Sequence, residues 1–548
     1  MSLKQSVAWS ERLFLNNLTR VKLILLASLF ITLSCNFSFF AHFSQEYVLG
    51  DNLVFVVVLG LIIFALITLL ISIVQLLLPV KWAVTLVLLI SVITAYFSDE
   101  FGVIIDIEMI RNSLQTDVAE AADLFTLSLL WRLLLLVALP VAMVAWLPLT
   151  KPSLQANWLV KLKSSAVLIL ASVVLIALCV GAFSAQFSSF IREHKKLRYY
   201  INPIQALYSG GRYLTAQIRA DRDTSYSLLS YYSEVPKTDP KRELIIMVVG
   251  ETARADHFAL NGYARPTTPL LSQEKNLINY PDISSCGTST AISVPCMFSL
   301  AGREDFDIDS AAYTENAFDI IAKAGVSVLW RDNNSDSKGV AVRQAYEEFK
   351  SPDVNPVCDD ECRDVGMLNG LQDYIDQQPH DILIVLHQMG SHGPAYYKRY
   401  PQEFEKFAPT CKTAELSNCS DEEIINAYDN TILYTDYFLS QVITLLKGNT
   451  QKFQTSMLYA SDHGESLGEN GLYLHGLPYA FAPDSQTHVP LIFWTDNASD
   501  IDIEATREQS QVANSHDAIS KTLITLFEIE SDVKFSLTPD LLKFKQGH

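Results

Sequence analysis

The stretch "SCGTSTAISVPCMF" (285–298) contains residues that could carry out covalent chemistry. Cys286 and Cys296 bracket a short run of hydroxyl side chains. The hydroxyls between the two cysteines belong to Thr288, Ser289, Thr290 and Ser293. Because a serine or threonine hydroxyl is barely ionised at neutral pH, such a nucleophile needs an adjacent base or direct coordination to a metal. The spacing does not choose among these hydroxyls, and a stapled turn without chemistry is the alternative.

Carboxylate and imidazole side chains follow several of the predicted strands. Glu251 comes directly after the run "ELIIMVVG", and Asp462 and His463 come directly after "TSMLYAS". His392 follows "DILIVLH" after a few residues. A lone carboxylate after a strand is often a helix cap, and a lone histidine is often structural, but recurrence at several strand ends favours a common site. Carboxylates and imidazoles suit a borderline divalent cation such as Zn²⁺.

Short β-branched runs alternate with helical patterns from Glu243 onward. The runs predicted as buried strands are 243–250, 326–330, 381–387, 455–461 and 489–494. Residues 421–447 have apolar side chains at helical spacing and predict one long helix. This alternation predicts an α/β domain with a mostly parallel sheet sandwiched by helices. In such sheets functional side chains collect beyond the carboxyl ends of the strands, where the acidic and histidine residues above lie.

Leu, Val, Ile, Ala and Phe dominate the first part of the chain. Several apolar runs there approach the length needed to cross a hydrocarbon core of about 30 Å. They cover residues 23–42, 53–78, 82–97, 126–148 and 164–183, of which the third is short. We interpret the first run as a membrane helix rather than a cleaved signal peptide, because further runs follow it. The pattern predicts a multi-pass α-helical membrane domain.

Basic residues are concentrated before the first run, between the second and third, and between the fourth and fifth. In the other loops the one basic residue is Arg111, which lies among several acidic residues. Since loops rich in Lys and Arg stay in the cytoplasm, we expect a cytoplasmic N-terminus and an outer location for the chain after residue 184. The predicted organisation is a five-helix membrane domain (1–183), a connector (184–240) and an outer catalytic domain (241–548).

The predicted connector mixes basic and aromatic residues and has few acids before Asp221. This composition is typical of a helix that lies on a membrane surface near anionic head groups. A solvated linker with scattered aromatic residues is the other interpretation.

Cysteines in the outer domain occur as close pairs. The pairs are Cys286/Cys296, Cys358/Cys362 and Cys411/Cys419. An oxidising compartment favours disulfides between such neighbours, although other pairings are open. A structural zinc site built on "CDDEC" is the alternative. The formal net charge of −19 argues against nucleic acid as a partner.

Several ordered motifs of the chain carry a resemblance to a known family. They are "GETARADHFALNGYARPTTPLL", "CGTSTAISVPCMFS", "WRDNNSDSKGV", "GSHGP", "YASDHGESLGENGLYLHG" and "THVPLIFW". In these motifs and in its apolar runs the chain resembles the lipid A phosphoethanolamine transferases, which include enzymes of colistin resistance. That family belongs to the alkaline phosphatase and sulfatase superfamily. The resemblance implies an outer domain with the alkaline phosphatase/sulfatase-like fold.

The resemblance also implies roles for residues, according to their positions in these motifs. Thr290 would be the nucleophile. One catalytic Zn²⁺ would be bound by Glu251, Thr290, Asp462 and His463. His392 and His475 would face the donor phosphate, carry protons or help to hold a second Zn²⁺ during turnover. The remaining matches surround the donor or the lipid substrate: Thr288, Ser289, Asn334, Ser335, Lys338, Glu465, Asn112, Thr116 and Glu120.

Some of these matches have simpler interpretations. Asn112, Thr116 and Glu120 share one helical face by their spacing, which is also typical of a plain polar surface. Lys338 lies in "NNSDSKG" and would otherwise be interpreted as a solvated turn lysine. We interpret His488 as structural.

The implied activity is a two-step transfer of phosphoethanolamine. Phosphatidylethanolamine would donate the group to Thr290, and a phosphate of lipid A would accept it from the phospho-threonine. The product gains an ammonium group and would attract polymyxin and other cationic peptides less. The implied location is the bacterial inner membrane, among membrane lipids and with a periplasmic catalytic domain, and we expect a monomer.

Other functions also fit these residues. A superfamily relative could use another acceptor, such as core sugar, or act as a phosphodiesterase or sulfatase that passes the group to water. The C/S-x-P-x-R context typical of sulfatases does not surround Thr290. A membrane-anchored receptor that binds lipid or metal without turnover is the alternative of a different class.

Overall fold

The computed structural model describes most of the chain, with gaps. The described residues are 19–47, 49–116, 118–146, 154–220, 225–236, 241–497, 499–535 and 538–545. The chain divides into two compact units. The first unit comprises Met1–Ile107 and Phe125–Arg212, and the second comprises Glu108–Leu124 and Tyr213–His548.

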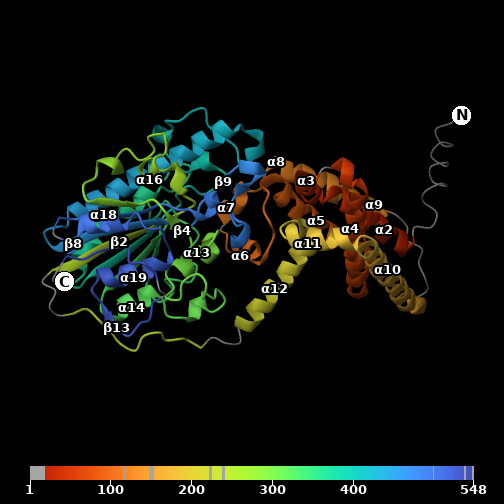
Figure 1. The fold of residues 1–548 in the computed structure, drawn as a ribbon, viewed down its shortest axis with the longest axis horizontal. Coiled ribbons are helices and arrows are strands. Elements are labelled where there is room, and N and C mark those ends of the chain that lie inside the picture. The colour runs from red at the N-terminus through yellow and green to blue at the C-terminus, as the bar shows by residue number, and fades with distance from the viewer. Residues whose placement is uncertain are drawn as a thin grey trace. The chain divides into compact units, whose positions relative to one another are not determined.

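Helices make up the first unit (Figure 1). They are α2 (Arg20–Ser34), α3 (Phe37–Glu46), α4 (Leu49–Leu77), α5 (Val80–Phe101), α8 (Leu127–Leu133), α9 (Leu139–Trp146), α10 (Leu154–Ala182) and α11 (Ser184–Glu193), while α12 (Ile204–Ala220) runs across the boundary with the second unit. Among the described residues, 4 helices are long and apolar enough to cross a membrane, or up to 5 if the bent pair α2–α3 is one span. The run expected to be short lies in the continuous helix Val80–Phe101, which meets this criterion.

The axes of α2 and α3 are bent by 50° at the short break between them, and Asn202 makes hydrogen bonds at this break. Its side-chain amide donates to the carbonyl oxygens of Cys35 (3.0 Å) and Ser91 (2.6 Å). Its backbone N–H donates to Oδ1 of Asn36 (2.9 Å). Backbone groups released by a break inside an apolar environment must find partners within the protein. The Asn202 side chain supplies such a partner at this bend.

A seven-stranded sheet forms the centre of the second unit, with strand order β3-β11-β8-β2-β7-β5-β6. The strands are β2 (Arg242–Gly250), β3 (Leu277–Tyr280), β5 (Ser327–Asp332), β6 (Ala345–Glu348), β7 (Ile382–His387), β8 (Phe453–Ser461) and β11 (Leu491–Thr495). The strands from β8 to β6 are parallel, whereas β11 is antiparallel to both of its neighbours. The expected mostly parallel sheet is confirmed.

Helices cover both faces of this sheet (Figure 1). One apolar core joins it to α13 (Thr290–Met297), α14 (Ala317–Lys323) and α19 (Asp517–Leu526). The other core joins it to α15 (Leu371–Gln377) and α16 (Asp421–Lys447). Alternate residues of β2 enter the two cores, which is why this central strand is apolar along its length. Smaller elements are α17 (Asp484–Thr487), α18 (Ile503–Gln509), and the strand pairs β1 (Ser233–Glu234) with β13 (Glu530–Ser531), β9 (Ser466–Leu467) with β10 (Tyr473–Leu474) and β4 (Ile283–Ser284) with β12 (Asn514–Ser515).

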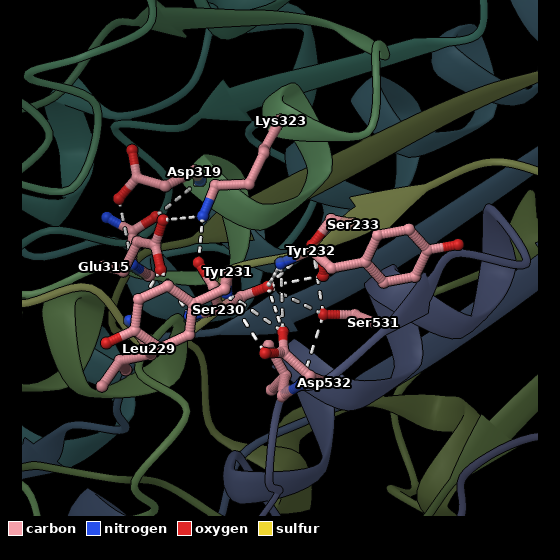
Figure 2. A network of polar contacts seen from close by, with 12 residues as sticks. Leu229, Ser230, Tyr231, Tyr232, Ser233, Glu315, Asp319, Lys323, Ser531 and Asp532 are labelled. Carbon is pink, nitrogen blue, oxygen red and sulfur yellow. Dashed lines mark hydrogen bonds and ion pairs between the residues drawn. The ribbon is translucent and has the colours of Figure 1, made fainter.

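Within the second unit, a polar network fixes residues 229–232, which precede β1, to side chains of the α/β domain (Figure 2). Asp532 Oδ1 accepts hydrogen bonds from the backbone N–H groups of Tyr231 (3.1 Å) and Tyr232 (3.2 Å). Glu315 Oε2 accepts from the N–H of Ser230 (2.9 Å), and Lys323 Nζ donates to the Ser230 carbonyl (2.6 Å). This part of the expected connector is therefore held by side chains of the α/β domain.

Candidate metal centre and active site

The pairing of β2 with β8 brings two acidic residues to the same end of the sheet. Gly250 lies opposite Ser461 in this parallel pair, so Glu251 and Asp462 leave adjacent strands at the same level. The Asp462 N–H donates to the Gly250 carbonyl (2.9 Å), which extends the pairing by one step. The sheet therefore places both carboxylates at its carboxyl edge, as the sequence predicts.

Glu251, Asp462 and His463 form a buried cluster of ligand-type atoms. One such atom from each residue lies within 4.8 Å of the others. His463 Nε2 is 3.3 Å from Asp462 Oδ2 and 3.6 Å from Glu251 Oε1. All three residues are nearly inaccessible to solvent.

Hydrogen bonds orient the acceptor atoms of this cluster toward one another. His463 Nδ1 is 2.9 Å from the Gly464 carbonyl, so Nδ1 carries the proton and Nε2 is an acceptor. Burial lowers the pKa of His463 to about 4, which keeps the ring neutral. Asp462 Oδ1 accepts from the N–H groups of Thr252 and His463, whereas its buried Oδ2 has no hydrogen-bond partner in the part of the chain that the structure describes. A buried carboxylate oxygen without a donor, beside two further acceptors, fits a bound divalent cation.

Thr290 is the hydroxyl residue of the disulfide loop that faces this cluster. Its Oγ1 lies 3.2 Å from Glu251 Oε2 and 3.3 Å from His463 Nε2. It is also the first residue of α13, where the helix dipole favours negative charge. Two other hydroxyls of the loop are occupied elsewhere: Thr288 Oγ1 donates to the Leu477 carbonyl, and Ser293 Oγ donates to the Asp462 carbonyl. Ser289, the N-cap of α13, is buried beside them.

The cysteines of the second unit form disulfides between the neighbours expected from the sequence. Cys286 is bonded to Cys296, Cys358 to Cys362, and Cys411 to Cys419. The first bond closes the loop that carries Thr290. The buried ring of His516 also holds this loop, because its Nδ1 accepts a hydrogen bond from the Cys286 N–H (3.1 Å). No sequence motif pointed to His516.

His475 lies beside His463 of the metal-ligand cluster, and His392 lies beside His475. The His475 ring centroid is 4.3 Å from that of His463 and 5.9 Å from that of His392. His475 Nδ1 is 2.9 Å from Glu465 Oε2, so this buried carboxylate orients the ring. Tyr396, which the sequence did not indicate, donates its hydroxyl proton to Glu465 Oε1 (2.7 Å). The expected group of His392, His475 and Glu465 is thus assembled at one place.

The loop after β5 contacts the metal-ligand cluster through Asn334. Its amide Nδ2 donates to Glu251 Oε2 (2.8 Å) and to the Gln388 carbonyl (2.7 Å), and its Oδ1 accepts the Ser335 N–H. Lys338 folds back in this loop, with Nζ 2.6 Å from the Ser335 carbonyl. The structure therefore places Asn334 against Glu251 itself.

Asp332 holds this loop in place from the end of β5. Its Oδ1 accepts the N–H groups of Asn334 (2.9 Å) and Asp336 (3.2 Å). Its Oδ2 accepts from Trp330 Nε1 and pairs with His387 Nδ1, each at 2.8 Å. Asp332 lies in the "WRDNNS" motif, but its residue type and position alone did not indicate a role.

Replacing Asn334 with alanine is expected to lower metal affinity by about 10- to 100-fold, because Glu251 loses the donor that orients it. The measurement is a metal dissociation constant by competition with a chelator, made without any lipid. Asn449→Ala is the matched control, since the Nδ2 group of that buried side chain donates two hydrogen bonds, to Gln372 and to the Leu445 carbonyl near the end of α16. Unchanged metal affinity in Asn334→Ala would show that this residue does not support the ligand.

The residues expected to bind the lipid substrate lie on a segment of the second unit. Asn112 belongs to α6 (Ile107–Gln115), and Thr116 follows it directly and donates its hydroxyl to the Asn112 carbonyl (2.8 Å). Both side chains are partly exposed. The side chain of Glu120 lies outside the described part of the chain. His488 makes a hydrogen bond with the Pro281 carbonyl (2.7 Å), in agreement with a structural role.

Comparison with known proteins shows which family the chain is similar to. Residues 243–529 match the family model "Sulfatase", and residues 63–218 match the family model "Phosphoethanolamine transferase EptA/EptB". Phosphatidylethanolamine transferase Mcr-1 of Escherichia coli is 44% identical over 524 residues, covering 93% of this chain and 95% of that protein. The chain belongs to the phosphoethanolamine transferase family. Phosphoethanolamine transferase EptA of Escherichia coli is 35% identical over 523 residues.

This phosphoethanolamine transferase is also similar in its fold to a solved structure that spans both the helical region and the α/β domain. The integral membrane protein lipooligosaccharide phosphoethanolamine transferase A (EptA) from Neisseria meningitidis matches with a TM-score of 0.87 at 33% identity, covering 93% of this chain and 95% of that one. The expected combination of a helical membrane region with a sulfatase-like α/β domain is therefore confirmed. At the carboxyl edge of the sheet, the hydroxyl of Thr290 lies beside a cluster of ligand-type atoms from Glu251, Asp462 and His463.

Proposed function

We propose that this chain transfers phosphoethanolamine from phosphatidylethanolamine to a phosphate of lipid A, through a covalent phospho-threonine at Thr290. The observation that carries the proposal is the approach of Thr290 Oγ1 to Glu251 Oε2 (3.2 Å) and His463 Nε2 (3.3 Å) in a buried site. Relatives supply the substrate classes. They include proteins named phosphatidylethanolamine transferase and Kdo(2)-lipid A phosphoethanolamine 7''-transferase.

In the first step, Thr290 Oγ forms a bond to the phosphorus of the donor lipid, and its hydroxyl proton passes to the histidine side of the site. The bond from phosphorus to the glycerol oxygen breaks, and diacylglycerol leaves after its oxygen takes up a proton. His475 or His392 would give that proton, since the His475 ring lies beside His463 and the His392 ring lies beside His475. Glu465 orients His475 for this task through its hydrogen bond to Nδ1.

In the second step, a phosphate hydroxyl of lipid A passes its proton to the histidine side of the site, and its oxygen attacks the phosphorus of the phospho-threonine. The bond between phosphorus and Thr290 Oγ breaks, and the threonine hydroxyl regains a proton from the same histidine side of the site. Lipid A leaves with an added ammonium group, which reduces its attraction for polymyxin and other cationic peptides. Charge builds up on the phosphoryl oxygens in both steps, and stabilising that charge is the main task of such a site.

The residues that would hold the metal are Glu251, Thr290, Asp462 and His463. Asp462 Oδ2 supports this proposal most clearly, because it is buried and accepts no hydrogen bond from the described residues. When bound, Zn²⁺ would act as a Lewis acid on the phosphoryl oxygens and lower the pKa of the threonine hydroxyl. Oxygen and imidazole ligands without thiolate suit Zn²⁺. His392 and His475 would be near enough to contribute to a second ion.

We also propose a location for the reaction. The first unit would lie in the bacterial inner membrane with a cytoplasmic N-terminus, and residues 241–548 would form the periplasmic catalytic domain, by the distribution of basic residues in the loops. The disulfides support an oxidising compartment. A monomer would contain every residue that the reaction needs.

Purified protein mixed with phosphatidylethanolamine and lipid A is expected to yield diacylglycerol and lipid A with an added phosphoethanolamine group. Both products can be measured by mass spectrometry. Release of diacylglycerol with free phosphoethanolamine and unmodified lipid A would indicate a phosphodiesterase instead. If neither lipid changes in the presence of zinc, the proposal fails.

A further inference from the structure

Residues 108–124 lie between α5 and α8 in the sequence, yet they belong to the same compact unit as the α/β domain. This segment contains α6 and α7 (Val118–Asp123), which Figure 1 shows beside that domain. It contacts several loops that carry the site residues. The family resemblance implies that Asn112 and Thr116 of this segment bind the lipid substrate. It implies no role for the contacts that hold the segment in place.

Two contacts fasten α6 to loops of the site. Lys338 Nζ donates to the Gln115 carbonyl (3.1 Å), so the loop after β5 is tied to the end of α6. Met109 packs on Gly476, where an added Cβ would lie only 2.6 Å from the Met109 Cε. Gly476 follows His475 directly. The segment thus rests on the loops of Lys338 and His475.

A third contact joins the other end of the segment to His392 through Arg399. Asp123 Oδ2 is 3.1 Å from Arg399 Nη2, and Asp123 Oδ1 is 2.5 Å from Lys398 Nζ. Arg399 Nε donates to the backbone carbonyl of His392 (2.7 Å). The remaining Nη1 of Arg399 pairs with Glu361.

Burial makes this arrangement sensitive to the loss of one partner. The Arg399 side chain is 3% exposed and that of Asp123 is 10% exposed. A buried guanidinium forms a planar fork of donors, and its position depends on all of its acceptors. Removing one acid from a buried ion pair leaves a poorly compensated charge, and the remaining partners shift to serve it. Any shift of Arg399 reaches His392 through the hydrogen bond to its carbonyl.

We propose that Asp123 is a positioning residue for the transfer reaction, because it holds His392 in place through Arg399. This inference rests on the proposed function of His392 beside the reacting phosphate. It makes the docking of segment 108–124 part of the assembly of the active site. Asp123 touches neither substrate nor metal in this account.

The test is a double-mutant cycle in full-length protein, with phosphatidylethanolamine and lipid A as substrates. Asp123→Asn is expected to lower kcat by about tenfold and to change KM by less than about twofold, because displacement of a catalytic group lowers the rate of chemistry. In a His392→Ala background the same substitution should cost less than about twofold. Asp123→Glu should recover most of the lost kcat.

Two further variants separate positioning from a general loss of stability. Arg399→Lys keeps the charge but loses the fork that bonds the His392 carbonyl, so it should reproduce the loss of kcat even if Asp123→Asn folds poorly. Glu274→Gln removes an acid that pairs with Lys447 and precedes β3, and it should keep wild-type kcat.

Wild-type kcat in both Asp123→Asn and Arg399→Lys would overturn the inference, as would a change in KM alone. Additive losses in the cycle would overturn it too, since Asp123 would then act elsewhere. Absence of transfer by the wild-type protein would instead be a failure of the proposed function.

Discussion

Replacing Thr290 with alanine is expected to lower the rate of phosphoethanolamine transfer by at least about 10³-fold. The substitution removes the oxygen that would form the bond to phosphorus. Ser293 and Thr288 are held by hydrogen bonds to carbonyl groups. The measurement is the initial rate of diacylglycerol release from phosphatidylethanolamine vesicles.

A matched pair of variants makes this result interpretable. Thr290→Ser retains the hydroxyl and is expected to retain measurable transfer. Thr444→Ala removes a hydroxyl that donates within α16 to the Ser440 carbonyl (2.8 Å), and it should leave the rate unchanged. If Thr290→Ala keeps a rate within about tenfold of wild type, the nucleophile has been assigned to the wrong residue.

Replacing Asp462 with asparagine is expected to remove the metal and to lower transfer by about 10³-fold. The substitution takes away a negative charge and one of the acceptors that converge on the cluster. Metal content of the purified variant, measured by elemental mass spectrometry, and transfer rate are the two readouts. Chelation of the wild-type protein should lower the rate similarly, and added Zn²⁺ should restore it.

Loss of fold would not explain the expected effect of Asp462→Asn. In the metal-free protein the acceptors of Glu251, Asp462 and His463 repel one another, so removing one charge should leave the melting temperature equal or higher. Asp532→Asn is the control, because that carboxylate belongs to the network of Figure 2 and not to the ligand set; it should retain metal. Full metal content in Asp462→Asn, or full activity of chelated wild type, would contradict the metal assignment.

The regular elements of the α/β domain were largely predictable because their signals are local. The strand preceding Glu251 is an apolar run that ends at a glycine, and the structure forms β2 there. The helix 421–447 has the same bounds in the structure, because Ser420 and Glu423 form a capping box at its start. Apolar periodicity and caps are properties of neighbouring residues, so the sequence displays them.

Long-range contacts were the part that sequence patterns could not provide. The support of Cys286 by His516 joins residues separated by 230 positions, and the antiparallel direction of β11 depends on chain connections outside the strand itself. The docking of Asp123 on Arg399 spans 276 positions. The choice of Thr290 among the loop hydroxyls likewise needed the three-dimensional positions of Glu251 and His463.

The most direct measurement is peptide mass spectrometry of the zinc-loaded protein after reaction with phosphatidylethanolamine in the absence of any acceptor. Our account predicts one phosphoethanolamine group on Thr290, formed together with one equivalent of diacylglycerol and lost again when lipid A is added. An unmodified Thr290 in protein that is turning over, or the group attached to another residue, would contradict it.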